Sequence, residues 1–238
     1  MLALVFSLLA GLAHYDRYYI PFGSMKPTLL VGDYIIVDRF AYGFPCARLL
    51  CGPDGKLWTA KPKRGDVIVF RHPKRSTIYI ERLIGLPNDT IQMIDGIIQI
   101  NGIPVKQEPN GEFKERYSRQ LGLSYPRCEN IPKINDACIK TQLIETLPNG
   151  VSYNILNITS SRMDNTGVYT VPYDHYFFLG DNRDNSVDSR FSIASGGVGF
   201  VPAKNLLAKA DTIWFSSAGN SMWSMTSWRK DRYHRPVK

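Results

Sequence analysis

The sequence predicts a mainly β fold, and three observations support this prediction. Short runs of β-branched and aromatic residues recur along the chain, separated by Gly, Pro and Asp. One stretch has the pattern of a β-hairpin, and no long segment shows the apolar period of an amphipathic helix. With 238 residues, 44% hydrophobic and 21% charged, the chain is large enough for a real core and too apolar for wholesale disorder.

The predicted strands follow in order from these runs. The first three are β-branched segments at 33–40, 66–71 and 78–84. Residues 90–95 and 97–100 flank Gly96 and are followed by Asn101-Gly102, a favoured hairpin turn. Further β segments are expected at 167–172, at 177–179 and at the run that ends in 213–215. This pattern favours an antiparallel β core.

The composition divides the chain into five predicted parts. Residues 1–14 are expected to form a short apolar membrane anchor, and residues 15–107 the first part of a β core. Residues 108–166 are polar and rich in turn residues, which indicates an inserted β subdomain. The core continues over 167–215, and a basic C-terminal tail covers 216–238.

The N-terminal residues 1–13 are uncharged and strongly apolar. This run is shorter than the roughly 20 residues that a spanning helix needs. It also lacks the basic residues that precede the apolar part of a secretory signal peptide. We interpret it as a membrane anchor that is short or shortened at its start, with a buried N-terminal helix as the alternative.

The net charge of +8 indicates attraction to an anionic surface, and the alternative is an ordinary basic surface. No helix-turn-helix, zinc-finger spacing or RNA-binding signature accompanies the charge, so we expect a lipid bilayer and no nucleic acid as partner.

Four cysteines are present, at Cys46, Cys51, Cys128 and Cys138. None of them forms a Cys-x-x-Cys pair or lies in a His-rich cluster, so their spacing does not suggest zinc. Two local disulfides would suit an oxidising compartment, and four free thiols remain the alternative. The sequence leaves the pairing open.

A candidate nucleophile is Ser24, in the segment 20–29 that reads IPFGSMKPTL. A serine hydroxyl needs a nearby base to take its proton and donors for the oxyanion that forms. Gly23 permits tight backbone geometry before the serine, and Pro27 restricts the chain after it. The alternative is a turn serine that bonds its own backbone.

Two further motifs follow downstream, YIER at 79–82 and GDNRDNSVDSR at 180–190. The second is dense in residues that favour tight, hydrogen-bonded loops, and it lacks the closing glutamate of a calcium-binding loop, so we expect no metal. Together with 20–29, these segments resemble the type I signal peptidases, membrane-bound serine endopeptidases with a Ser/Lys pair. The resemblance runs from residue 20 to about 215 and implies that family's antiparallel β core and no cofactor.

The resemblance assigns roles to the first two motifs. Ser24 would be the nucleophile. The position of the general-base lysine is occupied by Glu81, with Tyr79 and Arg82 matching on either side. Adjacent strand residues point to opposite faces, so Arg82 need not neutralise Glu81.

The downstream loop takes supporting roles by the same resemblance. Ser186 would orient the base. Asp188 and Arg190 would form a supporting ion pair, and Asp181 with Arg183 would brace the loop.

Two residues depart from the family pattern at the chemical centre. A buried glutamate can act as a base, but Glu81 has a shorter reach than lysine, and its charge would lie beside the oxyanion. Phe22 replaces a polar residue that helps hold the oxyanion, and it cannot donate. Lys26 and Lys74 are the nearby lysines, and either would need a rearranged site. We therefore predict impaired hydrolysis by Ser24, since losing a catalytic-unit member costs on the order of 10⁴ to 10⁶.

The function implied by the resemblance is removal of signal peptides from exported preproteins. It would take place at the bacterial inner (plasma) membrane, with the catalytic domain on the outer or periplasmic face. An extended substrate would add as a strand in an apolar groove, for which Ile20, Phe22, Met25, Tyr79 and Ile80 are candidates. One alternative is a non-catalytic homologue that binds signal peptides or a membrane partner without cleaving. Another is a peptidase of pilin-like subunits.

Overall fold

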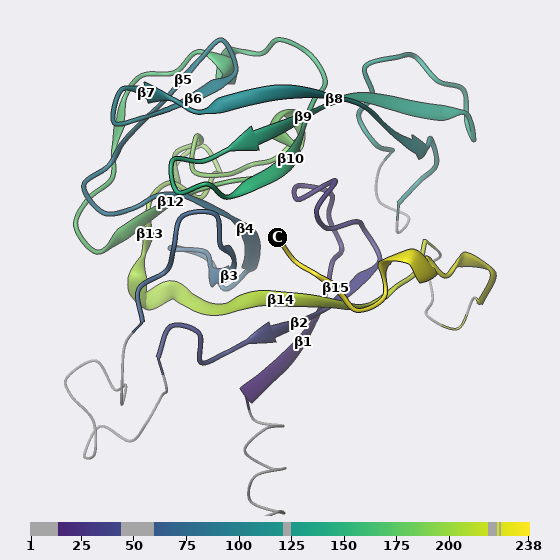
Figure 1. The fold of residues 1–238 in the computed structure, drawn as a ribbon, viewed down its shortest axis with the longest axis horizontal. Coiled ribbons are helices and arrows are strands. Elements are labelled where there is room, and N and C mark those ends of the chain that lie inside the picture. Colours follow the sequence, from purple (N-terminus) through teal and green to yellow (C-terminus); the bar gives the residue numbers. More distant parts are fainter. Residues whose placement is uncertain (1–13, 44–59, 121–124, 219–222, 224) are drawn as a thin grey trace, which may run out of the picture.

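The computed structural model describes residues 14–43, 60–120, 125–218, 223 and 225–238. These residues form antiparallel β-sheets joined by loops and single turns of 3₁₀ helix, so the predicted mainly β class is confirmed (Figure 1). The predicted anchor falls outside the described residues except for His14. Across the described ranges, no helix has both the length and the apolar character needed to cross a bilayer.

The largest sheet contains the strand with Glu81 and the two strands that flank the segment of Ser24. Its strand order is β1-β2-β14-β3-β4-β12-β13, and β15 pairs with β14. The bounds are Tyr15–Tyr19 for β1, Asp33–Asp38 for β2, Val67–Arg71 for β3, Ile78–Gly85 for β4, His175–Leu179 for β12, Val201–Pro202 for β13, Leu206–Ser216 for β14 and Arg235–Pro236 for β15.

A second sheet, in the order β11-β5-β6-β7, contains the predicted hairpin. Asp95 and Gly96 connect β5 to β6 with φ values of 48° and 77°, and Asn101 and Gly102 connect β6 to β7 with 55° and 78°. Both turns therefore use the left-handed conformations that these residue types favour. The bounds are Thr90–Ile94 for β5, Ile97–Ile100 for β6, Ile103–Pro104 for β7 and Tyr169–Thr170 for β11.

A third sheet, in the order β10-β9-β8, lies within the polar stretch. Its strands are β8 (Lys106–Arg116), β9 (Ala137–Thr146) and β10 (Ser152–Asn157). In the view of Figure 1, β9 and β10 lie below β5–β7, and β8 extends to the right of them. The exact boundaries of the five predicted parts stay a prediction. Single 3₁₀ turns occupy Arg162–Asp164, Arg183–Asn185, Ala203–Asn205, Met225–Ser227 and Lys230–Arg232.

The two faces of β3 and β4 belong to different apolar clusters. Ile80 packs with Ile20 and Met25 on one face, whereas Tyr79 and Leu83 pack with Phe70 on the other. Because strand side chains alternate, Glu81 points to the same face as Tyr79, and Arg82 points to the same face as Ile80. The pleat of β4 therefore separates the two charged neighbours.

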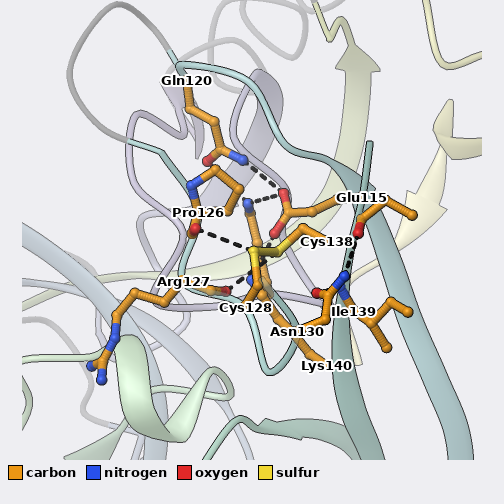
Figure 2. Close-up of a disulfide and its surroundings, with 11 residues drawn as sticks. Glu115, Gln120, Pro126, Arg127, Cys128, Asn130, Cys138, Ile139 and Lys140 are labelled. Carbon is orange, nitrogen blue, oxygen red and sulfur yellow. Dashed lines mark hydrogen bonds and ion pairs between the residues drawn. A yellow bond between two sulfur atoms is a disulfide. The ribbon is translucent and has the colours of Figure 1, made fainter. Parts of the chain in front are cut away.

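Cys128, in the connection between β8 and β9, forms a disulfide with Cys138 on β9, with an S–S distance of 1.99 Å (Figure 2). Cys46 and Cys51 lie outside the described residues, so a second pairing stays a prediction.

Candidate active site

Ser24 lies in the segment between β1 and β2, and the loop after β12 holds its backbone. The Asn182 N–H donates to the Ser24 carbonyl at 2.8 Å, and the Asn182 side-chain amide donates to the Gly23 carbonyl at 2.9 Å. A Cβ at Gly180 would lie 2.4 Å from Ser186 and 2.8 Å from the Ser24 carbonyl oxygen. Only glycine fits there, so the 20–29 and 180–190 segments are in direct contact.

Glu81 is 2% exposed and lies beside both candidate serines. The Ser186 hydroxyl donates to Glu81 Oε1 at 3.4 Å. The Ser24 hydroxyl is also a hydrogen-bonding neighbour of this carboxyl group. In contrast, Glu81 Oε2 is buried and meets no hydrogen-bond partner among the described residues. Ser24 and Ser186, from the first and third motifs, thus both lie beside the buried carboxyl group of Glu81 from the second motif.

The environment of Glu81 disfavours its charged form. Burial raises the pKa of Glu81 well above its ordinary value, and the nearby Asp188 and Asp181 carboxylates raise it further. The hydrogen bond with Ser24 and the charge of Arg190 oppose this rise without cancelling it. A protonated carboxyl group cannot take the proton of a serine hydroxyl.

The two arginines near Glu81 are bound to other carboxylates. Arg82 is fully buried and makes two hydrogen bonds to Asp181, at 2.8 and 2.7 Å. Arg190 makes two to Asp188, at 2.9 and 2.8 Å, which is the ion pair expected from the resemblance. Bidentate pairing of this kind fixes each arginine in place. Neither arginine is therefore the hydrogen-bonded partner of Glu81.

Asp181 and Arg183 brace the loop, but not as a pair with each other. Asp181 binds Arg82, whereas Arg183 binds Glu145 on β9 at 3.0 and 2.5 Å. The Tyr153 hydroxyl also donates to Glu145 at 2.5 Å. Although burial alone would raise the pKa of Glu145, Arg183 and these hydrogen bonds lower it below its ordinary value.

Glu145 had no signal in the sequence, because it lies 38 residues from Arg183 in a polar stretch outside the three motifs. Asn182 is a second residue whose role the sequence did not predict, although it is part of the downstream motif at 180–190. Its contacts with Ser24 and Gly23 show that it tethers the nucleophile segment.

Lys26 is bound to an acid outside the catalytic centre. Its ammonium group lies 2.5 Å from Glu115 Oε2 and donates to Gln120 at 3.0 Å. Lys140 holds the other Glu115 oxygen at 2.6 Å, beside the disulfide (Figure 2). Burial lowers the pKa of Lys26 to about 8, partly offset by Glu115. Lys74, the other nearby lysine in the sequence, is exposed.

The predicted groove residues separate into three environments. Ile20 and Met25 are buried core residues that pack with Ile80, so the groove at these positions stays a prediction. Tyr79 lies on the other face of β4, where its ring stacks on Phe70 with centroids 6.0 Å apart. Phe22 is 66% exposed and offers no donor. The Ser24 N–H makes no backbone hydrogen bond within the described ranges, which leaves it available to an oxyanion.

No group of His, Cys, Asp or Glu side chains suited to a metal ion occurs in the described part of the chain. Nucleophilic catalysis of acyl transfer uses a serine hydroxyl, a base beside it and a backbone donor for the oxyanion, and in this site the position of the base is occupied by the Glu81 carboxyl group.

Comparison with known proteins identifies the family. The family model described as "Signal peptidase, peptidase S26" matches residues 1–215. The chain therefore belongs to the signal peptidase S26 family, as the motifs predicted.

Two relatives from Rickettsia agree with this assignment. The signal peptidase I of Rickettsia typhi is 38% identical over 215 residues, which covers 85% of this chain and 72% of that protein. The signal peptidase I of Rickettsia akari is 38% identical over 227 residues, covering 90% and 76%. A crystal structure of a signal peptidase I from Enterococcus faecalis V583 is 28% identical, covers 63% of this chain and 97% of its own, and superposes with a TM-score of 0.33.

Proposed function

We propose that this chain recognises signal peptides of exported preproteins at a bacterial inner membrane, and that Ser24 is the nucleophile of a peptidase reaction that Glu81 impairs. The family and the relatives named signal peptidase I support the substrate class. The bilayer as partner, and a catalytic domain on its outer face, follow from the same family. The convergence of Ser24, Glu81 and Ser186 supports the site.

The reaction requires one proton to move twice. Ser24 Oγ attacks the carbonyl carbon of the scissile peptide bond, and a base takes the hydroxyl proton. The oxyanion is held by the Ser24 N–H, and the base then passes the proton to the leaving amine. Water hydrolyses the acyl-serine ester, which releases the signal peptide with a free carboxylate and restores the serine. The weak step in this chain is the first proton transfer.

The observation that carries the proposal is the buried, under-bonded Glu81 carboxyl group. In its protonated form it cannot accept the Ser24 proton. In its ionised form it would place a negative charge beside the developing oxyanion, which raises the barrier. A lysine at this position would avoid both problems, because burial favours the neutral amine, and the amine accepts a proton to become a cation.

The test is cleavage of a preprotein in detergent by the protein as it is, by Glu81→Lys and by Glu81→Lys with Ser24→Ala. We expect Glu81→Lys to raise the rate by about 10⁴ or more, because it restores a missing member of the catalytic unit. The serine-lacking double variant should show no gain. Glu81→Gln serves as the matched control, since it removes the charge without supplying a base.

Two outcomes would contradict the proposal. If the unaltered protein already cleaves at a rate that Glu81→Lys does not improve, Glu81 is not the defect. If the double variant cleaves as fast as Glu81→Lys, Ser24 is not the nucleophile.

A second candidate function is capture of signal peptides without cleavage. The raised pKa of Glu81 and the exposed, donor-free Phe22 favour it, since both weaken chemistry and leave the apolar cluster of Ile20, Met25 and Ile80 in place. Fluorescence anisotropy with a labelled signal peptide tests this function. Binding that is equal for the unaltered protein and for Ser24→Ala, with no product over hours, would favour capture over hydrolysis.

A further inference from the structure

A cavity of about 300 Å³ lies beside the nucleophile segment, and Ser24, Glu81 and Ser186 do not line it. It lies between the segment that follows Ser24, the end of β8 and the chain after β14. Five of its fourteen lining residues are cationic and one is acidic. The charged residues are Lys26, Lys114, Arg116, Arg119, Arg229 and Glu115.

The single acid in the lining is already neutralised. Glu115 Oε2 binds Lys26 at 2.5 Å and Gln120 at 2.6 Å, and Glu115 Oε1 binds Lys140 at 2.6 Å. Figure 2 shows Glu115 between Gln120 and Lys140 next to the disulfide. The two lysines therefore more than compensate this carboxylate, and it cannot serve as counter-charge for the arginines.

Arg229 is a cation of the cavity lining whose hydrogen bonds are incomplete. Its terminal nitrogen donates to the carbonyls of Val31 and Ser217 at 2.6 and 2.8 Å, but its Nε is buried with no hydrogen-bond partner among the described residues. Asp33 is 3.9 Å away. That carboxylate is already held by Arg232 at 2.6 Å and by Ser216 at 2.5 Å. A buried donor on a charged group is costly to leave unpaired, so Arg229 is an incompletely paired cation in the lining of the cavity.

Two exposed arginines complete the cationic lining. Arg116 and Arg119 form no ion pair within the described ranges. Arg119 lies over the Tyr125 ring at 5.9 Å. Arginine matches the oxygens of phosphate with two parallel N–H donors and holds its charge at any physiological pH. A lining with three arginines is therefore suited to a phosphate group.

We propose that this cavity is a binding site for a phosphate-bearing anion, either free phosphate or the headgroup of an anionic phospholipid. Arg116, Arg119 and Arg229 bind the phosphate oxygens, and Lys26 adds charge from the side of the nucleophile segment. Since Lys26 is two residues from Ser24, an anion in the cavity is coupled to the segment that carries the nucleophile.

The test measures binding of inorganic phosphate to the full chain in non-ionic detergent by isothermal titration calorimetry. The variant is Arg116→Gln with Arg119→Gln, because both side chains are exposed and outside the candidate catalytic machinery. The matched control is Arg71→Gln with Arg162→Gln, two exposed arginines outside the cavity lining that change the net charge by the same amount. We expect saturable binding that the cavity variant weakens at least about tenfold and the control leaves unchanged.

Vesicles of phosphatidylglycerol and of phosphatidylcholine distinguish the two sources of phosphate. If the cavity variant loses preference for phosphatidylglycerol and the control does not, the ligand is a lipid headgroup. If vesicle binding is unchanged while inorganic phosphate binding falls, the ligand is free phosphate. Absence of saturable phosphate binding, or an equal loss in both double variants, overturns the proposal.

Discussion

Two buried glutamates, Glu81 and Glu145, show which surroundings stabilise a buried carboxylate in this protein. Both are at most 2% exposed, and both contact the loop after β12. Glu145 accepts hydrogen bonds from Arg183, Tyr153 and Gln107, and its pKa is lowered. Glu81 accepts a long bond from Ser186, has a buried oxygen without a partner, and its pKa is raised.

The difference lies in the surroundings, because the residue type is the same. The Glu145 site presents the Arg183 cation to both carboxylate oxygens, with a tyrosine hydroxyl on one oxygen and a glutamine amide on the other, so the charged form is stabilised. The Glu81 site presents two serine hydroxyls and two already paired aspartates. Such a site would stabilise a neutral amine or a cation better than an anion. The comparison therefore indicates that the scaffold around position 81 is suited to a lysine.

The strongest test of this comparison is Glu145→Gln. It leaves the buried Arg183 without its counter-charge, so we expect a loss of about 3–5 kcal/mol in the free energy of unfolding. Urea unfolding near neutral pH measures it. The control is Glu108→Gln, an exposed glutamate that pairs with Lys106 at 2.9 Å, for which the loss should stay below about 1 kcal/mol. Equal losses in the two variants would show that Arg183 does not need Glu145.

A second test concerns Lys26, the buried cation whose pKa is lowered to about 8. Between this value and the ordinary 10.5, the unfolded chain binds a proton that the folded chain has released. Stability from this group therefore rises with pH across that window, by up to about 3 kcal/mol. Lys26→Met should lack the rise, and Lys114→Met on the exposed part of β8 should keep it. The test is the free energy of unfolding of both variants near pH 8 and near pH 10.5. An equal change in stability with pH for the two variants would refute the prediction.

The smallest expected effect is that of Glu81→Gln, and its pH dependence should be opposite to that of Glu145→Gln. The folded pKa of Glu81 is raised, so its contribution to stability is fully present below about 4.5 and is lost as the pH rises toward the folded value. Glu81→Gln should therefore stabilise the protein by roughly 1 kcal/mol or more near pH 8 and have little effect near pH 4.

Glu145 has a lowered pKa, so its contribution is present above about 4.5 and is lost as the pH falls through the folded value. Urea unfolding of both variants at the two pH values gives the effect of each substitution on the free energy of unfolding. If the two effects change with pH in the same direction, the distinction between the two sites is lost.

Much of the core sheet could be predicted because the information is local. The runs at 33–40, 66–71 and 78–84 correspond to β2, β3 and β4, and the turn residues Asp95-Gly96 and Asn101-Gly102 fix the hairpin. Strand β1 was not predicted, since its five residues read as an aromatic end to the apolar segment. Only the end of strand β14, at 213–215, was predicted from the sequence, because the pairing of this strand with both β2 and β3 depends on distant segments.

The sequence by itself determined the family, the three motif segments and the substitution of glutamate at position 81, since these depend only on residue identity and order. The tertiary structure decided the partners of the charged groups: Arg82 for Asp181, Arg183 for Glu145 and Lys26 for Glu115. These pairs join residues 38 to 99 positions apart. The physical reason is that a buried charge is stabilised by whatever the fold places within about 3 Å of it, and that distance cannot be read from spacing along the chain.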